Sequence, residues 1–353
     1  WEAYFVGMDG VLDTALPVGA YRIVVSAGPT HSLWPSDAHT SGGGALSISA
    51  GKTTTQTAVL YQAVDTSGWI SGDFHVHAVN SPDAQVENRR RVRSFLAEGV
   101  DVLVATDHDY VTDMTPYIAA EKAEARLVSI AGAEVTPFDY GHFNCFPIKH
   151  EASDLAGGAL DWAGGAGDGL DPPAIREAMS KRGDGMPAIV QINHPSSYMS
   201  AARVDILGGV SYGERATYRV TATPSHPRPD DAKTGNTGMF TDKFDALELL
   251  TGHRGGGGFG GDSFPQVINW WFTLLSRGVR WTGTAVSDAH GAISSQAGGA
   301  RSFVFVGPKH DTPKTFDMKT FIDAIRAGKV VGCDGPFVRI WAEKSGKKAV
   351  VGD

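Results

Sequence analysis

The sequence predicts an α/β fold in which a parallel β-sheet closes into a barrel, with a small β-rich unit in front of it. Two observations lead to this prediction. After residue 68, short apolar runs of strand length alternate with segments of helical periodicity, which is the pattern of repeated βα units. Before that residue, apolar and polar residues alternate with a period of two. We therefore expect a β-rich lead-in domain over 1–68 and a barrel domain over 69–353.

The lead-in region contains three segments with the alternation typical of β-strands, at 21–25, 45–49 and 53–63. Gly51-Lys52 lies between the last two and predicts a turn. We expect these segments to form a small sheet, half of a sandwich, that packs on the barrel. No helix is expected in this region.

The barrel strands are predicted from six short apolar runs, each of a length typical of a buried strand. They are residues 102–105, 127–131, 188–192, 246–250, 282–286 and 302–306. Helices are expected between them, over 83–98, from 171 onward, over 266–276 and over 319–327. Six or seven βα units favour a closed barrel over an open sheet, and the carboxyl ends of its strands would meet on one face.

Two features accompany these helices and strands. The helix from residue 171 begins with Asp171-Pro172-Pro173, an N-cap aspartate followed by proline in the first turn. The Gly-rich and polar segments 154–169 and 209–238 predict long loops near the active face.

Composition and charge argue against several classes of protein. The 353 residues include 31 Lys and Arg against 39 Asp and Glu, and this net charge of −8 argues against a nucleic-acid-binding surface. No apolar run reaches the length of a transmembrane helix. The two cysteines, Cys145 and Cys333, cannot make a disulfide framework. The sequence starts at Trp1 rather than Met, and together with the β-rich lead-in this predicts an exported, processed protein.

The strongest chemical signal is the segment Asp73-Phe74-His75-Val76-His77. Two histidines two residues apart on a strand point to the same face, so both imidazoles can reach one metal ion. A single His-x-His pair is not specific, but further histidines and carboxylates follow the predicted strands. They are Asp83, His108, Glu134, His142, His194, Asp288 and His290.

Each of these histidines, taken alone, could be a hydrogen-bonded loop residue. We assign that role to the remaining histidines, which are His31, His39, His150, His226, His253 and His310. Recurrence at the strand ends favours a metal site for the others. Imidazole and carboxylate donors without thiolate suit Zn²⁺, Mn²⁺ or Fe²⁺. Nine candidates are too many for one ion, so we expect two or three divalent ions joined by a bridging carboxylate.

The order of these residues resembles the motif set of the PHP (polymerase and histidinol phosphatase) superfamily. The flanking residues are similar to its carbaryl-hydrolase-like CehA/McbA branch, and the resemblance extends over about residues 16–340. They are Gly68-Trp69-Ile70-Ser71-Gly72 before Asp73, Asn80-Ser81-Pro82-Asp83, Gly141-His142-Phe143-Asn144, and the closing Ala327-Gly328-Lys329 to Gly335-Pro336.

The resemblance implies a distorted, TIM-like (β/α)₇ PHP barrel and a distribution of ligands among the ions. His75, His77, Glu134 and Asp288 would hold the first ion. Glu134 would bridge to a second ion held by His142 and His194. Asp83, His108 and His290 would hold a third ion where one is bound.

One segment departs from the resemblance. Relatives often read Asn-Gly after the strand at 246–250, whereas this chain has Thr251-Gly252-His253-Arg254. The resemblance therefore gives no basis for expecting a substrate contact from this loop. The Gly-rich stretch 255–261 behind it suggests an unusual lid.

Two further polar residues are candidates for roles around the metal motifs. Arg301 follows the last metal motif, and its guanidinium could hold a phosphate or carboxylate oxygen of the substrate, or form an ion pair at the barrel rim. Asp107 precedes His108 and could orient a ligand histidine or a bound water, or cap the loop backbone.

These residues predict a metal-dependent hydrolase that cleaves an ester bond of a small-molecule substrate. A metal-activated hydroxide would attack phosphorus or a carbonyl carbon, and His194, His290 or a bound water would protonate the leaving group. The superfamily implies a phosphoester, and the branch implies a carbamate, carboxyl ester or amide. A different class remains open, in which the barrel is a non-catalytic, metal-containing binding module. The complete set of ligands favours the enzyme.

Overall fold

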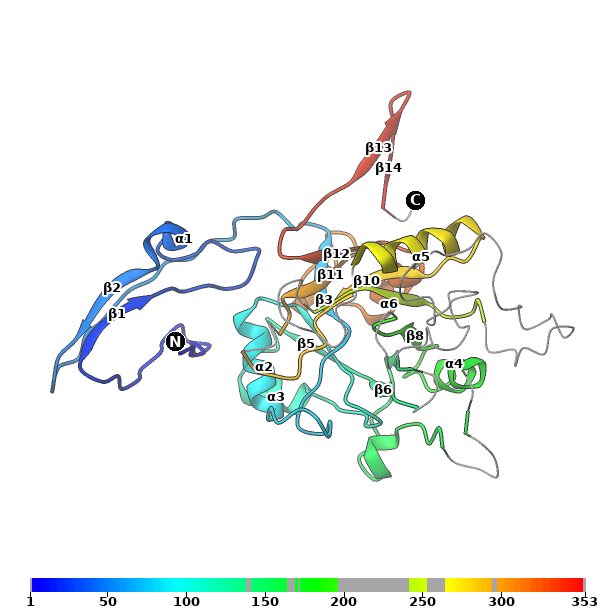
Figure 1. Cartoon of the computed structure of the whole chain (residues 1–353), viewed down its shortest axis with the longest axis horizontal. Helices are drawn as coiled ribbons and strands as arrows, with labels where there is room; N and C mark the ends of the chain where they lie inside the picture. Colours follow the sequence, from blue (N-terminus) through cyan, green and yellow to red (C-terminus); the bar gives the residue numbers. More distant parts are fainter. Residues whose placement is uncertain are drawn as a thin grey trace, which may run out of the picture.

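The computed structural model describes residues 2–137, 141–163, 169–170, 172–195, 241–252, 264–293 and 297–351. Within these ranges the chain is a mixed α/β protein with several sheets, and Figure 1 shows its main body with two thin β-hairpins projecting from it. The expected N-cap Asp171, the loop 209–238 and the Gly-rich stretch 255–261 lie outside the described residues, as do His226 and His253.

The N-terminal region forms one hairpin-like sheet of two strands. β1 (Gly19–Ile23) pairs antiparallel with β2 (Gly44–Ile48), and the short helix α1 (Ala38–Ser41) lies between them in sequence. The predicted strand at 53–63 is wrong, since only an isolated bridge between Gln62 and His31 is found there. Val59 and Tyr61 are 71% and 65% exposed, so the alternating apolar positions of this segment have no second layer to bury them.

The first large sheet has five strands in the order β12-β11-β3-β4-β5. β3 (Trp69–Asp73), β4 (Val102–Ala105) and β5 (Val128–Ala131) are parallel. β11 (Ala300–Phe305) runs antiparallel to both β3 and β12 (Val330–Asp334).

The second large sheet also has five strands, in the order β10-β9-β8-β7-β6. β8 (Ile189–Ile192), β9 (Ala246–Thr251) and β10 (Thr282–Val286) are parallel. β6 (Ala133–Val135) and β7 (Phe143–Phe146) are antiparallel to each other, and β7 is antiparallel to β8. The prediction of a wholly parallel sheet was therefore wrong.

The strands of the described residues do not close into the predicted barrel. Between β10 and β11, where a ladder would complete it, the hydroxyl of Ser302 instead accepts from the backbone N–H of Ala285 at 3.0 Å and donates to its carbonyl at 2.9 Å. The other ends of the two sheets are joined covalently, because Gly132 alone separates β5 from β6. The two sheets are therefore neighbours, but each keeps its own hydrogen-bond ladder.

Five helices accompany these sheets. They are α2 (Asn88–Ala97), α3 (Thr115–Ala120), α4 (Pro172–Ser180), α5 (Phe264–Ser276) and α6 (Met318–Arg326). α2 begins later than predicted, and α3 was not predicted because six residues are too few for a clear periodicity. Short 3-10 helices lie at Leu155–Gly158 and Pro313–Thr315.

The C-terminal part forms the second projecting hairpin in Figure 1, from β13 (Trp341–Lys344) and β14 (Lys347–Val350). Across the described ranges, none of the helices has the length and apolar character needed to span a bilayer.

The apolar core explains why the predicted strands were recognisable. Every residue of β4 and β8 is buried, so both faces of these strands are covered and their sequences read as short buried runs. Phe74 packs against both Phe146 and Phe321, with ring centroids 5.3 Å and 5.8 Å away. This rigid interior fixes the ends of the strands that carry the histidines and carboxylates.

Candidate metal centre

All nine predicted metal ligands lie in one cluster, although they come from distant parts of the sequence. They form four overlapping groups in which the candidate ligand atoms lie within 4.8 Å of one another. The groups are His75, His77 and Glu134; His75, His194 and Asp288; His108, Glu134 and His142; and His77, Asp83, His108 and His290.

The strand ends place these side chains, with two differences from the predicted positions. β3 ends at Asp73, so His75 and His77 lie just beyond the strand instead of on it. Glu134 follows β5, as predicted, but lies within a further short strand, β6. Asp83 lies in the loop between β3 and α2, and the other ligands follow β4, β8 and β10 or directly precede β7, where chain segments leave the sheets and bring their side chains to a common place.

Glu134 is the centre of the cluster. Its side chain is fully buried, and five imidazole rings contact its carboxylate. Its Oε1 lies 3.2 Å from His75, 3.1 Å from His142 and 3.4 Å from His194. Its Oε2 lies 3.3 Å from His77 Nε2 and 2.9 Å from His108 Nδ1. A carboxylate placed in this way can serve two ions, one on each oxygen.

The first set of ligands has the spacing expected around one ion. Asp288 Oδ1 lies 3.2 Å from both His75 Nε2 and His77 Nε2. Glu134 completes the set, with Oε1 3.2 Å from His75 Nε2 and Oε2 3.3 Å from His77 Nε2. An ion with bonds of about 2.0–2.1 Å in tetrahedral geometry separates its ligand atoms by about 3.3 Å. Each of these four nitrogen–oxygen distances is therefore close to the edge of a metal coordination shell.

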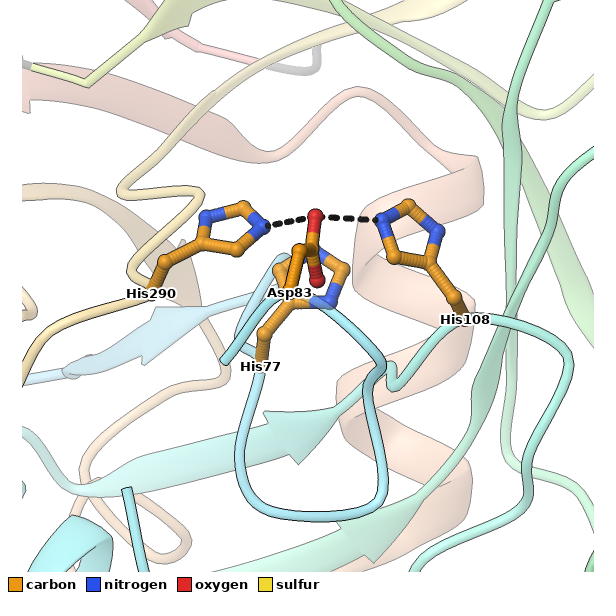
Figure 2. Close-up of side chains that lie close together, drawn as sticks. All are labelled: His77, Asp83, His108 and His290. Carbon is orange, nitrogen blue, oxygen red and sulfur yellow. Dashed lines mark hydrogen bonds and ion pairs between the residues drawn. The ribbon is translucent and has the colours of Figure 1, made fainter. Parts of the chain in front are cut away.

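Asp83 joins the third set of ligands, as Figure 2 shows. One oxygen, Oδ2, lies 3.2 Å from His108 Nε2 and 3.1 Å from His290 Nε2, and the ring of His77 lies behind the carboxylate. The side chain of Asp83 is 50% exposed and that of His290 is 28% exposed, whereas His75, His77 and Glu134 are fully buried. This set is therefore the open side of the cluster.

Buried atoms without hydrogen-bond partners test whether a metal fits here. Within the described part of the chain, His75 Nε2, His77 Nε2 and Glu134 Oε2 are buried and make no hydrogen bond. The Nδ1 atoms of both histidines already pair, with Glu248 and Ser81 respectively. Leaving several buried polar atoms unpaired in one place is costly. A divalent cation between these atoms would satisfy all of them, so the residues fit a metal.

Two ligands adopt a backbone conformation that is unfavourable for residues other than glycine. His194 has φ of 25° and Asp288 has φ of 50°. Non-glycine residues in this region are strained, and such strain persists only where the surrounding structure enforces it. These are the turns directly after β8 and β10, and the conformation helps to aim both side chains into the cluster.

The charges of the cluster shift its pKa values in opposite directions. Burial would raise the pKa of Glu134, but the adjacent rings of His75, His142 and His108 hold it well below its ordinary value. Burial lowers the pKa of His77 to about 4. Burial would also lower the pKa of His108, yet the carboxylates of Glu134 and Asp83 raise it to about 10. In the metal-free protein, His108 is therefore protonated at neutral pH.

The raised pKa of His108 predicts a pH dependence for the metal-free protein. A histidine whose pKa is raised on folding contributes stability below its unfolded pKa of about 6.5, and this contribution is lost as the pH rises toward about 10. We expect the melting temperature of chelator-treated protein to fall between these pH values. The fall should be smaller in His108→Asn but unchanged in His39→Asn, a surface control. Parallel melting curves for all three proteins would contradict the prediction.

Several buried polar residues that support the ligands were not predicted. Ser81 contacts His77 Nδ1 at 2.8 Å, and Asn193 donates to Glu134 Oε1 at 2.7 Å. Glu248, which is fully buried in β9, contacts His75 Nδ1 at 2.7 Å. An ionisable residue inside the apolar run 246–250 was the available signal for Glu248. The other two show no pattern that distinguishes them from ordinary loop residues.

Arg91 on α2 clamps the two loops that carry ligands. Its guanidinium is fully buried and donates to the carbonyls of His77 at 2.8 Å, Ala289 at 2.8 Å and Gly291 at 2.9 Å. One side chain therefore ties the segment after β3 to the segment after β10. It had not been predicted, because nothing in the periodicity of α2 marks it.

We expect Arg91→Leu to destabilise the protein by at least about 3 kcal/mol, because three carbonyls would lose a charged donor at about 1–3 kcal/mol each. Chemical denaturation measures this loss. Arg301→Leu is a matched control, since it also removes a buried arginine that binds backbone carbonyls. Both variants should lose stability, but only Arg91→Leu should also weaken metal binding at a temperature where both are folded. Equal metal binding by the two variants would argue against the clamp.

Arg301 lies at the start of β11 and binds the protein rather than the ligand cluster. It is fully buried, donates to the carbonyls of Gly298 at 2.6 Å and Gly99 at 3.3 Å, and lies 3.9 Å from Glu98. These are the contacts of the rim ion pair, one of the two roles considered for it.

The contacts also show the surroundings of Asp107 and Cys145. Asp107 accepts from the backbone N–H of Ala78 at 2.6 Å and from the hydroxyl of Thr112, so it caps the loop after β3. Cys145 is buried in the apolar core and its Sγ contacts the carbonyl of Met179 at 3.5 Å. Neither residue belongs to a ligand group.

Comparisons with known proteins found similar solved structures only. No protein-family model matches the chain, and neither does any curated protein. A two-domain protein from Bacteroides vulgatus that contains a predicted PHP-like metal-dependent phosphoesterase is 18% identical, with a TM-score of 0.46 over 80% of this chain and 70% of that one. PsfC from Pseudomonas syringae is 17% identical, with a TM-score of 0.39 over 70% and 87%.

A third structure is the lesion-specific endonuclease PfuEndoQ from Pyrococcus furiosus. It is 14% identical, with a TM-score of 0.40 over 74% of this chain and 56% of that one. All three identities are below 20% and all three TM-scores are below 0.5.

Proposed function

We propose that the chain is a metal-dependent hydrolase that cleaves an ester bond, with Glu134 as the carboxylate that bridges two metal ions. The observation that carries this proposal is the contact of five imidazoles with one fully buried carboxylate. Hydrogen bonding alone does not account for this carboxylate, because its Oε2 and the Nε2 atoms of His75 and His77 make no hydrogen bond. A cluster of cations would satisfy these atoms.

We propose that the ligands divide among the ions as the resemblance implies. His75, His77, Asp288 and Glu134 would hold one ion, and Glu134 would share a second with His142 and His194. Asp83, His108 and His290 would hold a third. Because the donors are imidazole and carboxylate, Zn²⁺, Mn²⁺ and Fe²⁺ are the cations that fit.

When bound, such ions supply a hydroxide near neutral pH by lowering the pKa of a coordinated water. The substrate would bind at the exposed side of the ligand cluster, where Asp83 and His290 are accessible. His290 is also the more exposed of the two histidines considered for protonating the leaving group, at 28% against 16% for His194. The buried histidines on the other side exclude bulk water from the cluster.

For the substrate class, we propose a phosphoester, on the resemblance of the ligand order to the PHP superfamily. The second candidate is a carbamate, carboxyl ester or amide, on the similarity of the flanking motifs to the carbaryl-hydrolase-like branch. Both reactions use the same hydroxide, so the ligand cluster does not separate them.

The test is metal analysis of protein purified with metal added, followed by a panel of chromogenic esters. The panel should contain a phosphomonoester, a phosphodiester, a carboxyl ester and an aryl carbamate, and a DNA oligonucleotide should be assayed beside it. We expect two or three ions per chain and hydrolysis that a chelator stops. Fewer than one ion per chain would overturn the proposal. Stoichiometric metal without hydrolysis of any panel member would favour the binding module instead.

A further inference from the structure

Glu248 is a buried carboxylate that none of the predicted motifs contains. It lies in β9, is fully buried and contacts two metal ligands from different strand ends. Its Oε1 lies 2.7 Å from His75 Nδ1, and its Oε2 accepts from the backbone N–H of His194 at 2.6 Å. The partners are 173 and 54 residues away in the sequence.

All four groups that contact this carboxylate are donors. Besides the two ligands, Gln191 Nε2 donates to Oε1 at 2.9 Å and the hydroxyl of Thr251 donates to Oε2 at 3.0 Å. The orientation of Gln191 is fixed from its other side, because its Oε1 accepts from the hydroxyl of Thr284 at 2.9 Å. A carboxylate is the only group of this shape that accepts from all four.

The contact with His75 determines which ring nitrogen carries a proton. Because the carboxylate of Glu248 only accepts, Nδ1 of His75 must be the donor. When the ring is neutral, Nε2 is then the nitrogen left with a lone pair, and it faces Glu134 and Asp288 at 3.2 Å each. A histidine that binds a metal is oriented in just this way, through its second nitrogen.

The contact with His194 restrains a strained backbone. His194 has φ of 25°, a conformation that a non-glycine residue adopts only where its surroundings enforce it. The hydrogen bond of its N–H to Glu248 provides that restraint at the turn after β8. Its ring thereby keeps its place 3.4 Å from Glu134.

We propose that Glu248 is a positioning residue that sets two ligands of the metal centre at once, the tautomer of His75 and the backbone of His194. This inference rests on the proposed metal centre but concerns a residue outside it. Glutamine cannot replace Glu248. Whichever way its amide is turned, an N–H group would face a donor, either His75 with Gln191 or His194 with Thr251.

The experiment combines metal binding with NMR of the histidine rings. In zinc-loaded wild type labelled with ¹⁵N-histidine, His75, assigned by its absence in His75→Asn, should show a proton on Nδ1. Glu248→Gln should weaken binding of the tightest ion by about 10–100-fold, the usual cost of losing such a partner, and should change the His75 and His194 signals. Asp245→Asn is the matched control, because Asp245 directly precedes β9 but pairs with Arg326 and the N–H of Val190.

The outcomes separate this proposal from the proposed function. Wild type that binds no metal overturns the hydrolase, yet the His75 tautomer can still be determined in that protein. A His75 ring without a proton on Nδ1 in wild type overturns the role of Glu248, and this result does not depend on whether the variant folds. Wild-type affinity and unchanged ring signals in Glu248→Gln also overturn it. A similar loss of affinity in Asp245→Asn would reduce the effect to general destabilisation of β9 and so overturn it too.

Discussion

Glu134→Gln is expected to abolish turnover while the protein remains folded. The amide has one acceptor oxygen in place of two and carries no charge, so it cannot serve the ions on both sides of Glu134. Its NH₂ group would also face an imidazole, since Oε1 lies 3.1 Å from His142 and Oε2 lies 2.9 Å from His108. We expect activity to fall by more than about 100-fold, because losing only a hydrogen-bond partner of a metal ligand already costs up to about 100-fold.

The measurements for this variant are activity, metal content and circular dichroism. Metal content should fall together with activity, because two ions lose a shared ligand. Glu121→Gln is the control, since Glu121 is a largely buried glutamate that pairs with Arg89 and Arg93 on α2 instead of with histidines. It should keep its activity and its metal. Activity close to wild type in Glu134→Gln would show that this carboxylate is not the bridge.

Asp83→Ala should remove one ion per chain and leave the others bound. Asp83 contributes the only carboxylate oxygen within hydrogen-bond distance of both His108 and His290 among the described residues. The alternative role of Asp83 is to cap the following helix, because aspartate is a common N-cap residue. The helix α2 begins at Asn88 with Glu87 at its N-cap, so Asp83 does not hold that position. Its loss should therefore affect metal binding more than helix stability.

Elemental analysis and thermal melting distinguish the two roles of Asp83. Asp113→Ala is a suitable control, because Asp113 accepts from the N–H of Thr115 at the start of α3 and contacts none of the ligands. That control should lower the melting temperature and keep every ion. If Asp83→Ala instead shows the same behaviour as the control, with unchanged stoichiometry, there is no third ion at this place.

The sequence by itself predicted six of the strands and the nine residues that form the cluster. Apolar runs such as 102–105 and 282–286 match β4 and β10, because a strand buried on both faces has to be apolar throughout. The histidines and carboxylates could be selected because they follow such runs, and chain segments leaving a packed sheet bring their side chains together. The structure assembles all nine of them in one cluster. Local pattern was sufficient here, since each residue is placed by the element next to it.

Only the tertiary structure decided how the strands pair and what supports the ligands. The directions of β7 and β11, and the side-chain contact of Ser302 where a closed ladder was expected, depend on partners far away in the sequence. Arg301 was a candidate for substrate contact by its position after the last motif, yet its donors are directed to Gly298 and Gly99. Glu248 reaches His75 across 173 residues. Periodicity reports which face of an element is buried, but the hydrogen-bond partner of a buried polar group is set by three-dimensional packing, which no local pattern contains.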